Sequence, residues 1–172
     1  LERLNQYTDR LSILITDLFE VSKANSGNID LEYSDINIIE FMEQVCAENE
    51  ELLQAKNLQL VTNLPEKEIY VCLDGNKTYR IFENLFTNIS KYALENTRVF
   101  LDVKDIGNSV MIIMKNTSKE PLDFDSDITE RFVRGDKSRH ESGSGLGLAI
   151  VKSFTEVQNG TFMIETDGDL FK

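Results

Sequence analysis

The first residues of the chain carry apolar side chains at alternating steps of three and four positions. These side chains are Leu4, Tyr7, Leu11, Leu14, Leu18 and Val21. The spacing is typical of the seam of a coiled coil or an antiparallel helix bundle. A helix about 36 Å long with one apolar seam is not stable alone in water, so the pattern predicts a partner helix. Gly27, between Ser26 and Asn28, is suited to end this helix in a left-handed conformation.

The remaining chain alternates between helical and strand-like patterns. Helical periodicity covers residues 37–55, 76–93 and 146–157, and the last of these helices is ended by Asn159 and Gly160. Strand patterns cover residues 29–33, 58–64, 69–73, 99–103, 110–114, 161–165 and 169–171. Residues 110–114 are apolar on both faces, which places them inside a covered sheet. The pattern predicts an α+β fold, a two-layer α/β sandwich with helices on one face of a mixed sheet.

Two parts are expected along the chain. Residues 1–28 form the long helix and its linker, and residues 29–172 form one compact domain. The sequence begins without a methionine inside a helical pattern and stops on the apolar Leu170 and Phe171 followed by Lys172, so we expect a fragment of a longer protein.

Composition narrows the classes of partner. The net charge of −12, from 30 acidic and 18 basic residues, repels nucleic acid and acidic lipid surfaces. No apolar run approaches the roughly 18 residues that span a bilayer, so we expect the chain not to be membrane-embedded. Cys46 and Cys72 lack metal-ligand spacing and lie in apolar surroundings, which indicates reduced core residues of an intracellular protein.

Three polar residues share one face of the helix predicted at 76–93. Asn84, Asn88 and Lys91 follow the i, i+4, i+7 spacing. The opposite face is apolar and carries Phe82, Leu85, Phe86, Ile89 and Ala93. Amide oxygens are hard neutral ligands for Mg²⁺, and a lysine neutralises phosphate oxygens, so the polar face suits phosphate chemistry. The alternative is the solvated face of an ordinary amphipathic helix.

A glycine-rich loop leads directly into the last predicted helix. Gly143, Gly145 and Gly147 alternate in the segment GSGLGLAI, with Leu146 between the last two. Glycines allow close backbone approach, and the amino end of a helix receives anions such as a triphosphate. A flexible connection is the alternative. The segment is neither a Walker loop nor a dinucleotide fingerprint.

A polar stretch from residue 115 to 144 is long for an ordinary loop and predicts a functional lid, with a short helical turn near residues 127–132. It contains a basic cluster in which Arg134 and Arg139 are suited to bind phosphate bidentately. Phe132 is placed to pin the lid to the domain. A solvated charged loop would carry the same residues.

In this order and spacing, ENLFTNISKY, RFVRGDKSR and GSGLGLAI resemble the asparagine box, the phenylalanine box and the second glycine box of sensor histidine kinases. These kinases belong to the superfamily of gyrase, Hsp90, histidine kinase and MutL ATPases. The segment LITDLFEVSKANSGNIDL is similar to the end of the kinases' dimerisation helix and its linker. The resemblance implies a Bergerat-type ATP-binding fold that uses ATP and Mg²⁺. It also implies transfer of the γ-phosphoryl group to a histidine outside this chain.

The same resemblance implies partners and a location. The full-length protein would form a homodimer through the N-terminal helix and pass its phosphoryl group to a response regulator. The catalytic part would be cytoplasmic, and the full-length protein would be anchored in the cell membrane.

The resemblance also assigns roles to individual residues. Asn84 and Asn88 would hold Mg²⁺ and phosphates, with Asn88 the principal metal ligand. Tyr92 would line the nucleotide pocket. The expected phosphate contacts are Lys91, Arg134 and Arg139, and the expected lid residues are Gly143, Gly145, Leu146 and Gly147.

The sequence departs from the family where an Asp-x-Gly-x-Gly box is usual, because it reads NTSKEP from residue 116. Asn116 takes the aspartate position, and its amide oxygen can still accept a hydrogen bond from the adenine amino group, with about half the strength of a charged acceptor. Two other functions stay open: a degenerate nucleotide-binding or scaffold module, and a serine kinase of the anti-sigma type. His140 lies in the predicted lid, unlike the family's acceptor histidine, and is expected to be an exposed lid residue.

Overall fold

The computed structural model describes residues 2–119 and 146–172. The helices are α1 (Glu2–Asn25), α2 (Ile38–Glu48), α3 (Glu50–Gln54), α4 (Gly75–Tyr92) and α6 (Gly147–Val157). The strands are β1 (Tyr33–Asn37), β2 (Gln59–Asn63), β3 (Tyr70–Asp74), β4 (Arg98–Asp105), β5 (Val110–Thr117), β6 (Thr166–Asp167) and β7 (Leu170–Phe171).

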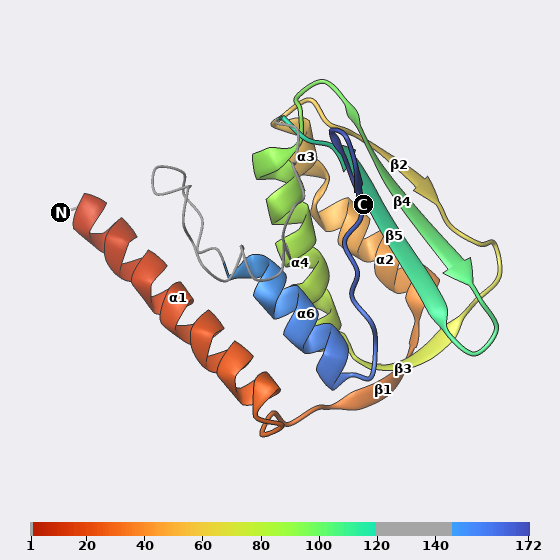
Figure 1. Ribbon diagram of the computed structural model, residues 1–172, viewed down its shortest axis with the longest axis horizontal. Helices are drawn as coiled ribbons and strands as arrows, with labels where there is room; N and C mark the ends of the chain where they lie inside the picture. The colour runs from red at the N-terminus through yellow and green to blue at the C-terminus, as the bar shows by residue number, and fades with distance from the viewer. Residues whose placement is uncertain (1, 120–145) are drawn as a thin grey trace.

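The strands form a mixed five-stranded sheet and a separate two-stranded sheet. The larger sheet has the order β2-β4-β5-β7-β6, in which β2 and β4 are parallel and the other neighbours antiparallel. Strands β1 and β3 pair antiparallel. The helices α2, α4 and α6 lie on one side of the large sheet, and α1 lies outside α4 and α6 (Figure 1). The predicted α+β sandwich with helices on one face of a mixed sheet is confirmed.

The main core lies between α2, α4 and β4. Its most deeply buried side chains include Met42, Phe86, Val99 and Leu101, each with 0% of its surface exposed. Such close packing of large apolar side chains is the principal source of stability for α4.

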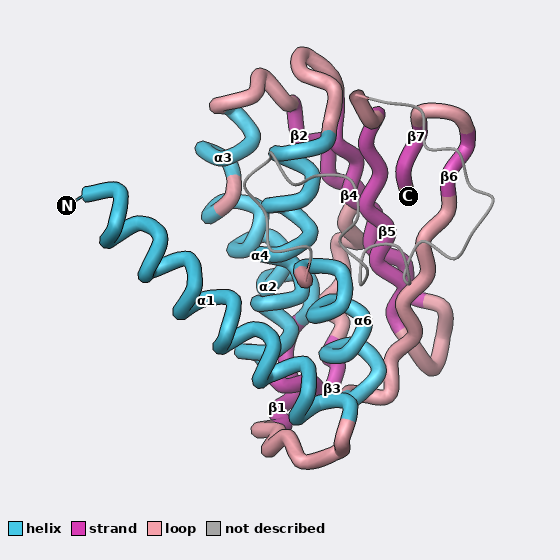
Figure 2. The backbone as a smooth tube through the Cα atoms, turned by 60° about the vertical axis from the view of Figure 1, so that its left-hand side comes forward, coloured by secondary structure: helices cyan, strands magenta, loops and turns pink. Residues whose placement is uncertain are grey.

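A second apolar cluster connects α1 to the domain. Ala24 of α1 is buried against Ile81 of α4 and against residues of α6, among them Ile150 and Phe154. Val21 packs against the same cluster. Only the C-terminal turns of α1 take part, and the helix leaves the body towards its N-terminus (Figure 2).

The seam predicted along α1 therefore divides between two surroundings. Val21 contacts the domain, whereas Leu11 and Leu18 are 57% and 58% exposed. Ile15 and Phe19 are also more than half exposed. Within the residues that the structure describes, no helix combines the length and the apolar character that a membrane crossing requires.

Three predicted elements differ from the structure. The first strand is Tyr33–Asn37 rather than 29–33, because it pairs with β3 in the register Ile36↔Val71, while Ile29 packs against the second cluster. The helix predicted over 37–55 is divided at Asn49, whose side-chain Nδ2 donates to the Val45 carbonyl at 2.8 Å. Residues 161–165 form no strand.

The region after α6 is irregular for a tertiary reason. Phe162 packs against the second cluster instead of entering the sheet. Pairing begins only at Glu165, which exchanges backbone hydrogen bonds with Lys172 at 2.7 and 2.8 Å.

The two cysteines differ from each other. Cys46 is buried as expected, and burial raises the pKa of its thiol to about 11. Cys72 is exposed, so its assignment to the core is wrong. It lies on the outer face of the two-stranded β1–β3 sheet, between the partly buried Val71 and Leu73.

Candidate functional site

Helix α4 is fixed at its start by a capping aspartate. Asp74 is 3% exposed, and its carboxylate accepts hydrogen bonds from the backbone N–H groups of Lys77 and Glu32, both at 2.9 Å. An aspartate in this position satisfies N–H groups that the helix itself cannot pair. Because Phe82, Phe86 and other apolar residues turn towards the core, the polar face of α4 is turned towards α6.

The structure brings the asparagine face of α4 against the start of α6. A methyl group at Gly147 would lie 3.1 Å from Asn84 Oδ1 and 3.5 Å from Asn88 Oδ1. Asn88 Nδ2 would be 3.6 Å from the same methyl group, so the Oδ1 of Asn84 and the whole carboxamide of Asn88 converge on the first residue of α6. This close approach also explains why position 147 is a glycine.

The amino end of α6 carries the features of an anion site. Helix α6 begins at Gly147 with no side-chain cap from Leu146 and no acidic residue in its first turn. N–H groups at this end of a helix, together with the helix dipole, favour a negatively charged ligand. The two converging asparagines lie beside these groups, so the pair of elements forms one polar site.

The carboxamide of Asn84 is held in a defined orientation. Its Nδ2 donates to the backbone carbonyl of Arg80 at 2.7 Å, which leaves Oδ1 directed at Gly147. Sequence reasoning missed this use of Arg80. The acceptor is a backbone carbonyl that any residue four positions before Asn84 would offer, so the side chain at position 80 gave no signal.

The donors fit a magnesium ion that is partly coordinated by phosphate. Among the described residues there is no group of three or more His, Cys, Asp or Glu side chains that could hold a metal by itself. Asn84 and Asn88 instead offer neutral oxygens, and Mg²⁺ commonly combines one or two protein ligands with substrate phosphates and water.

The C-terminal end of α4 lies beside the end of β5. The backbone N–H of Lys119 donates to the carbonyl of Tyr92 at 3.0 Å, and the Lys119 Nζ donates to the carbonyl of Lys91 at 3.0 Å. Tyr92 is 37% exposed. These contacts bring Lys91 and Tyr92 close to the strand that carries Asn116.

Asn116 is buried on the helix side of the sheet. It is 5% exposed and lies opposite Val99 of the neighbouring strand β4, which belongs to the main core. Its Nδ2 donates to the Thr117 carbonyl at 3.3 Å, an arrangement that leaves Oδ1 as the group able to accept. The side chain thus offers an acceptor, as the comparison with the aspartate of the family requires.

Other predicted site residues lie outside the described residues. They are Arg134, Arg139, Gly143 and Gly145, together with Phe132, His140 and the helical turn near 127–132. The described members are Asn84, Asn88, Lys91, Tyr92, Asn116, Leu146 and Gly147. Their predicted roles stay predictions.

A pocket of about 620 Å³ lies elsewhere, lined by residues that include Gln59, Arg98, Phe100 and Thr117. Val99 and Leu101 point into the core, so Arg98 and Phe100 lie on the opposite face of the sheet. The pocket is therefore separated from the asparagine face by the sheet itself.

Substituting Gly147 by alanine tests the close approach of the two helices. We expect Gly147→Ala to weaken nucleotide binding, because the new methyl group displaces the Asn84 carboxamide, while folding stability is kept by the better helix propensity of alanine. Calorimetric titration and thermal melting measure the two effects. Gly75→Ala is the matched control, since Gly75 begins α4 and its added methyl group would meet only the Ile36 Cδ1, at 3.3 Å. Equal losses of binding in the two variants would contradict the expectation.

The α/β sandwich, the two asparagines of α4 beside Gly147 and the start of α6 fit a nucleotide-binding protein of the ATPase class. Residues 73–169 match the family model described as histidine kinase-, DNA gyrase B-, and HSP90-like ATPase. The chain belongs to this family, and it is a catalytic ATP-binding domain of the histidine kinase type. The predicted family is confirmed.

Curated relatives include the sensor protein kinase WalK of Staphylococcus aureus. The chain is 34% identical to it over 160 residues, which cover 89% of the chain and 38% of that protein. WalK of Staphylococcus aureus strain JH9 has the same identity, with 26% of its length covered. The chain thus spans well under half of either relative.

Solved structures agree on the fold. The Acinetobacter baumannii histidine kinase AdeS has a TM-score of 0.77 and 18% identity, covering 99% of this chain and 79% of that one. Full-length ShkA in complex with AMPPNP has a TM-score of 0.79 and 20% identity, with coverage of 99% and 36%. The histidine kinase ThkA in complex with the response regulator protein TrrA has a TM-score of 0.72 and 20% identity, with coverage of 99% and 49%.

Proposed function

We propose that the chain is the ATP-binding catalytic part of a two-component sensor histidine kinase. It would transfer the γ-phosphoryl group of ATP to a histidine outside this chain, from which a response regulator would receive it. The observation that carries the proposal is the convergence of the Asn84 and Asn88 carboxamides on Gly147 at the start of α6. The names of the relatives favour a histidine kinase over the serine kinase and over the degenerate module.

Each part of the site has a task in this proposal. The N–H groups at the start of α6 would hold phosphate oxygens, and Lys91 would neutralise their charge. Asn84 and Asn88 would hold Mg²⁺, which supplies neutralisation of the phosphate charge when it is bound. Asn116 would accept from the adenine amino group through Oδ1. Positioning and charge neutralisation of this kind dominate catalysis of phosphoryl transfer.

Further proposals concern the longer protein. It would dimerise through α1 and a partner helix, work in the cytoplasm and be anchored in the cell membrane. AMPPNP in the ShkA structure and TrrA in the ThkA structure support ATP and a response regulator as ligands of this chain.

The test of the proposal is the dependence of Mg·ATP binding on Asn88. We expect Asn88→Ala to weaken binding by tenfold or more, on the order of one lost charge-assisted ligand contact, and to leave the fold intact because Asn88 is only partly buried. Isothermal titration of the purified chain, with and without Mg²⁺, measures this. An affinity of the variant equal to that of the wild type would remove Asn88 from the site.

A further inference from the structure

One face of α4 contacts α1 along its first half and the start of α6 along its second half. Lys77, Arg80, Asn84 and Asn88 follow each other at steps of three and four residues and so lie along the same side of the helix. The first half of this face, with Lys77 and Arg80, is covered by α1. The second half, with Asn84 and Asn88, faces Gly147 and the nucleotide site proposed above.

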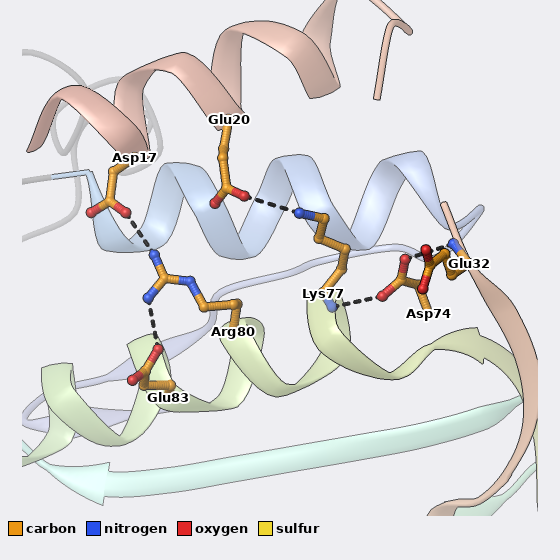
Figure 3. Close-up of polar contacts among 7 residues, drawn as sticks. All are labelled: Asp17, Glu20, Glu32, Asp74, Lys77, Arg80 and Glu83. Carbon is orange, nitrogen blue, oxygen red and sulfur yellow. Dashed lines mark hydrogen bonds and ion pairs between the residues drawn. The ribbon is translucent and has the colours of Figure 1, made fainter. Parts of the chain in front are cut away.

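Charged side chains hold α1 on the first half of this face (Figure 3). Arg80 Nη2 pairs with Asp17 Oδ1 at 2.6 Å, and Arg80 Nη1 pairs with Glu83 Oε2 at 2.8 Å. Lys77 Nζ pairs with Glu20 Oε1 at 3.0 Å. We call the Asp17–Arg80 and Glu20–Lys77 contacts the α1–α4 ion pairs.

Apart from these ion pairs, the described part of α1 lies against α6. Val21 and Ala24 pack against the second apolar cluster, and Ser153 Oγ donates a 2.9 Å hydrogen bond to Asn25 Oδ1. Upstream of Asp17, Leu11 and Ile13 are more than half exposed. Asp17 therefore lies near the point where α1 leaves the domain. Its ion pair with Arg80 is close to the N-terminal end of the contact between α1 and the domain.

Burial of the Asp17–Arg80 ion pair has an unfavourable desolvation energy. Asp17 is 5% exposed, and burial, together with the nearby Glu20 and Glu83, raises the pKa of its carboxyl although Arg80 lowers it. Burial lowers the pKa of Arg80, but Glu83, Asp17 and Glu20 raise it on balance, so the guanidinium stays charged. Desolvation offsets much of the attraction in a buried pair of this kind. A ligand with greater negative charge can compete for Arg80.

We propose that Arg80 is a phosphate-binding residue that the nucleotide and Asp17 compete for. Its backbone carbonyl already holds Asn84, and its long side chain starts one turn before Asn84 on the face of the nucleotide site. A triphosphate at Asn84 and Asn88 draws the guanidinium away from Asp17 and so loosens the docking of α1. Because coupling between two binding events is reciprocal, docked α1 lowers the affinity for nucleotide by the same factor. The proposal rests on the proposed function, since it requires the nucleotide at these asparagines.

Two matched substitutions separate a phosphate contact from mere loss of α1 docking. Arg80→Gln and Lys77→Gln each remove one positive charge that pairs with a carboxylate of α1. In titrations of the whole chain with a non-hydrolysable ATP analogue and Mg²⁺, we expect Arg80→Gln to weaken binding about tenfold, as for one lost charged contact. Lys77→Gln leaves the affinity unchanged or raises it, because it only loosens α1.

Two more variants test the competition itself. Asp17→Asn removes the competing carboxylate charge and is expected to tighten analogue binding several-fold, about threefold to tenfold for a coupling of ordinary size. Arg80→Lys keeps the charge and is expected to retain part of the affinity that Arg80→Gln loses. Circular dichroism of each variant checks that the fold is kept.

Hydrogen exchange distinguishes competition for Arg80 from a purely structural role of this residue, because a structural role would not make the protection of α1 depend on nucleotide. In the wild type, we expect the amides of residues 17–25 to lose protection when the analogue binds, and in Arg80→Gln we expect no change with analogue. Equal affinities of Arg80→Gln and Lys77→Gln, or unchanged protection of α1 in the wild type, overturn the proposal. If binding still depends on Asn88 in that case, the proposed function stands and only the role of Arg80 falls. Failure of the wild type to bind nucleotide at all overturns both.

Discussion

The chain by itself is expected to bind Mg·ATP and to acquire no acid-labile, base-stable phosphate. Its single histidine, His140, lies between Arg139 and Glu141 in the segment predicted as a lid. Phosphoryl transfer needs the nucleophile in line with the γ-phosphate and within a few ångströms of it, a geometry that a helical bundle can fix. We therefore expect the acceptor to lie on a helix that packs beside α1 in the longer protein.

Incubation with ATP labelled in the γ-phosphate tests this expectation. The wild type and His140→Ala are expected to remain equally unlabelled after acid and alkaline treatment. Addition of the preceding helical segment of the full-length protein is expected to give label on that segment. Transfer should be slow, because covalent tethering normally supplies an effective concentration on the order of millimolar.

Other results would point to the alternatives that the sequence left open. Acid-stable label on a serine of this chain would favour a serine kinase. An absence of transfer from both the mixture and the full-length protein, despite measured ATP binding, would favour a degenerate nucleotide-binding module. Label on a histidine of the added helical segment is the result that agrees with a histidine kinase.

The elements that the sequence predicted well are those with strong local periodicity. Helix α4 was predicted within one residue of its observed ends, because its apolar and polar faces are cleanly separated. The meeting of Asn84 and Asn88 with the glycine at the start of α6 was expected only through the resemblance to a family. Their common face on α4 could be predicted from spacing alone, but the position of α6 could not.

The elements that the sequence misplaced depend on partners far along the chain. The first strand lies at Tyr33–Asn37 because β3, from Tyr70 onwards, supplies its register. Residues 161–165 read as a strand, yet Phe162 is drawn to the second apolar cluster. A periodic pattern records which residues are apolar, not which of two apolar surfaces they will meet.

The pair of Asp17 and Arg80 shows the same limit for charged residues. The two residues are separated by 63 positions. The apolar pattern of α1 predicted contacts of its leucines and gave no prediction for Asp17. In the structure, Asp17 and Glu20 face the domain together with Val21 and Ala24, whereas Leu11 and Leu18 lie on the exposed side of α1. Helix α1 thus has one face that contacts the domain and one that is exposed, and each face can be tested by its own substitutions.

Substitutions on the exposed face of α1 are expected to abolish association without unfolding the domain. Leu11, Ile15 and Leu18 follow helical spacing and are 57%, 60% and 58% exposed. The double change Leu11→Glu and Leu18→Glu places charge in this apolar surface, so we expect a monomer at concentrations where the wild type self-associates. Folding stability should change by only about 0.5 kcal/mol per site, as for ordinary surface positions. Sedimentation and thermal melting measure the two quantities.

Ala24→Glu is the contrasting change on the opposite face. Ala24 is 8% exposed and lies against Ile81, Ile150 and Phe154, so a charge there is expected to destabilise the contact by several kcal/mol, on the order of 2–4, or to detach α1 altogether. Deletion of residues 1–26 should likewise leave a folded monomer with a lower melting temperature, because it uncovers Phe154 while the main core between α2, α4 and β4 is untouched. Unfolding of the truncated chain would mean that α1 belongs to the catalytic core, and the domain boundary expected after residue 28 would then be wrong.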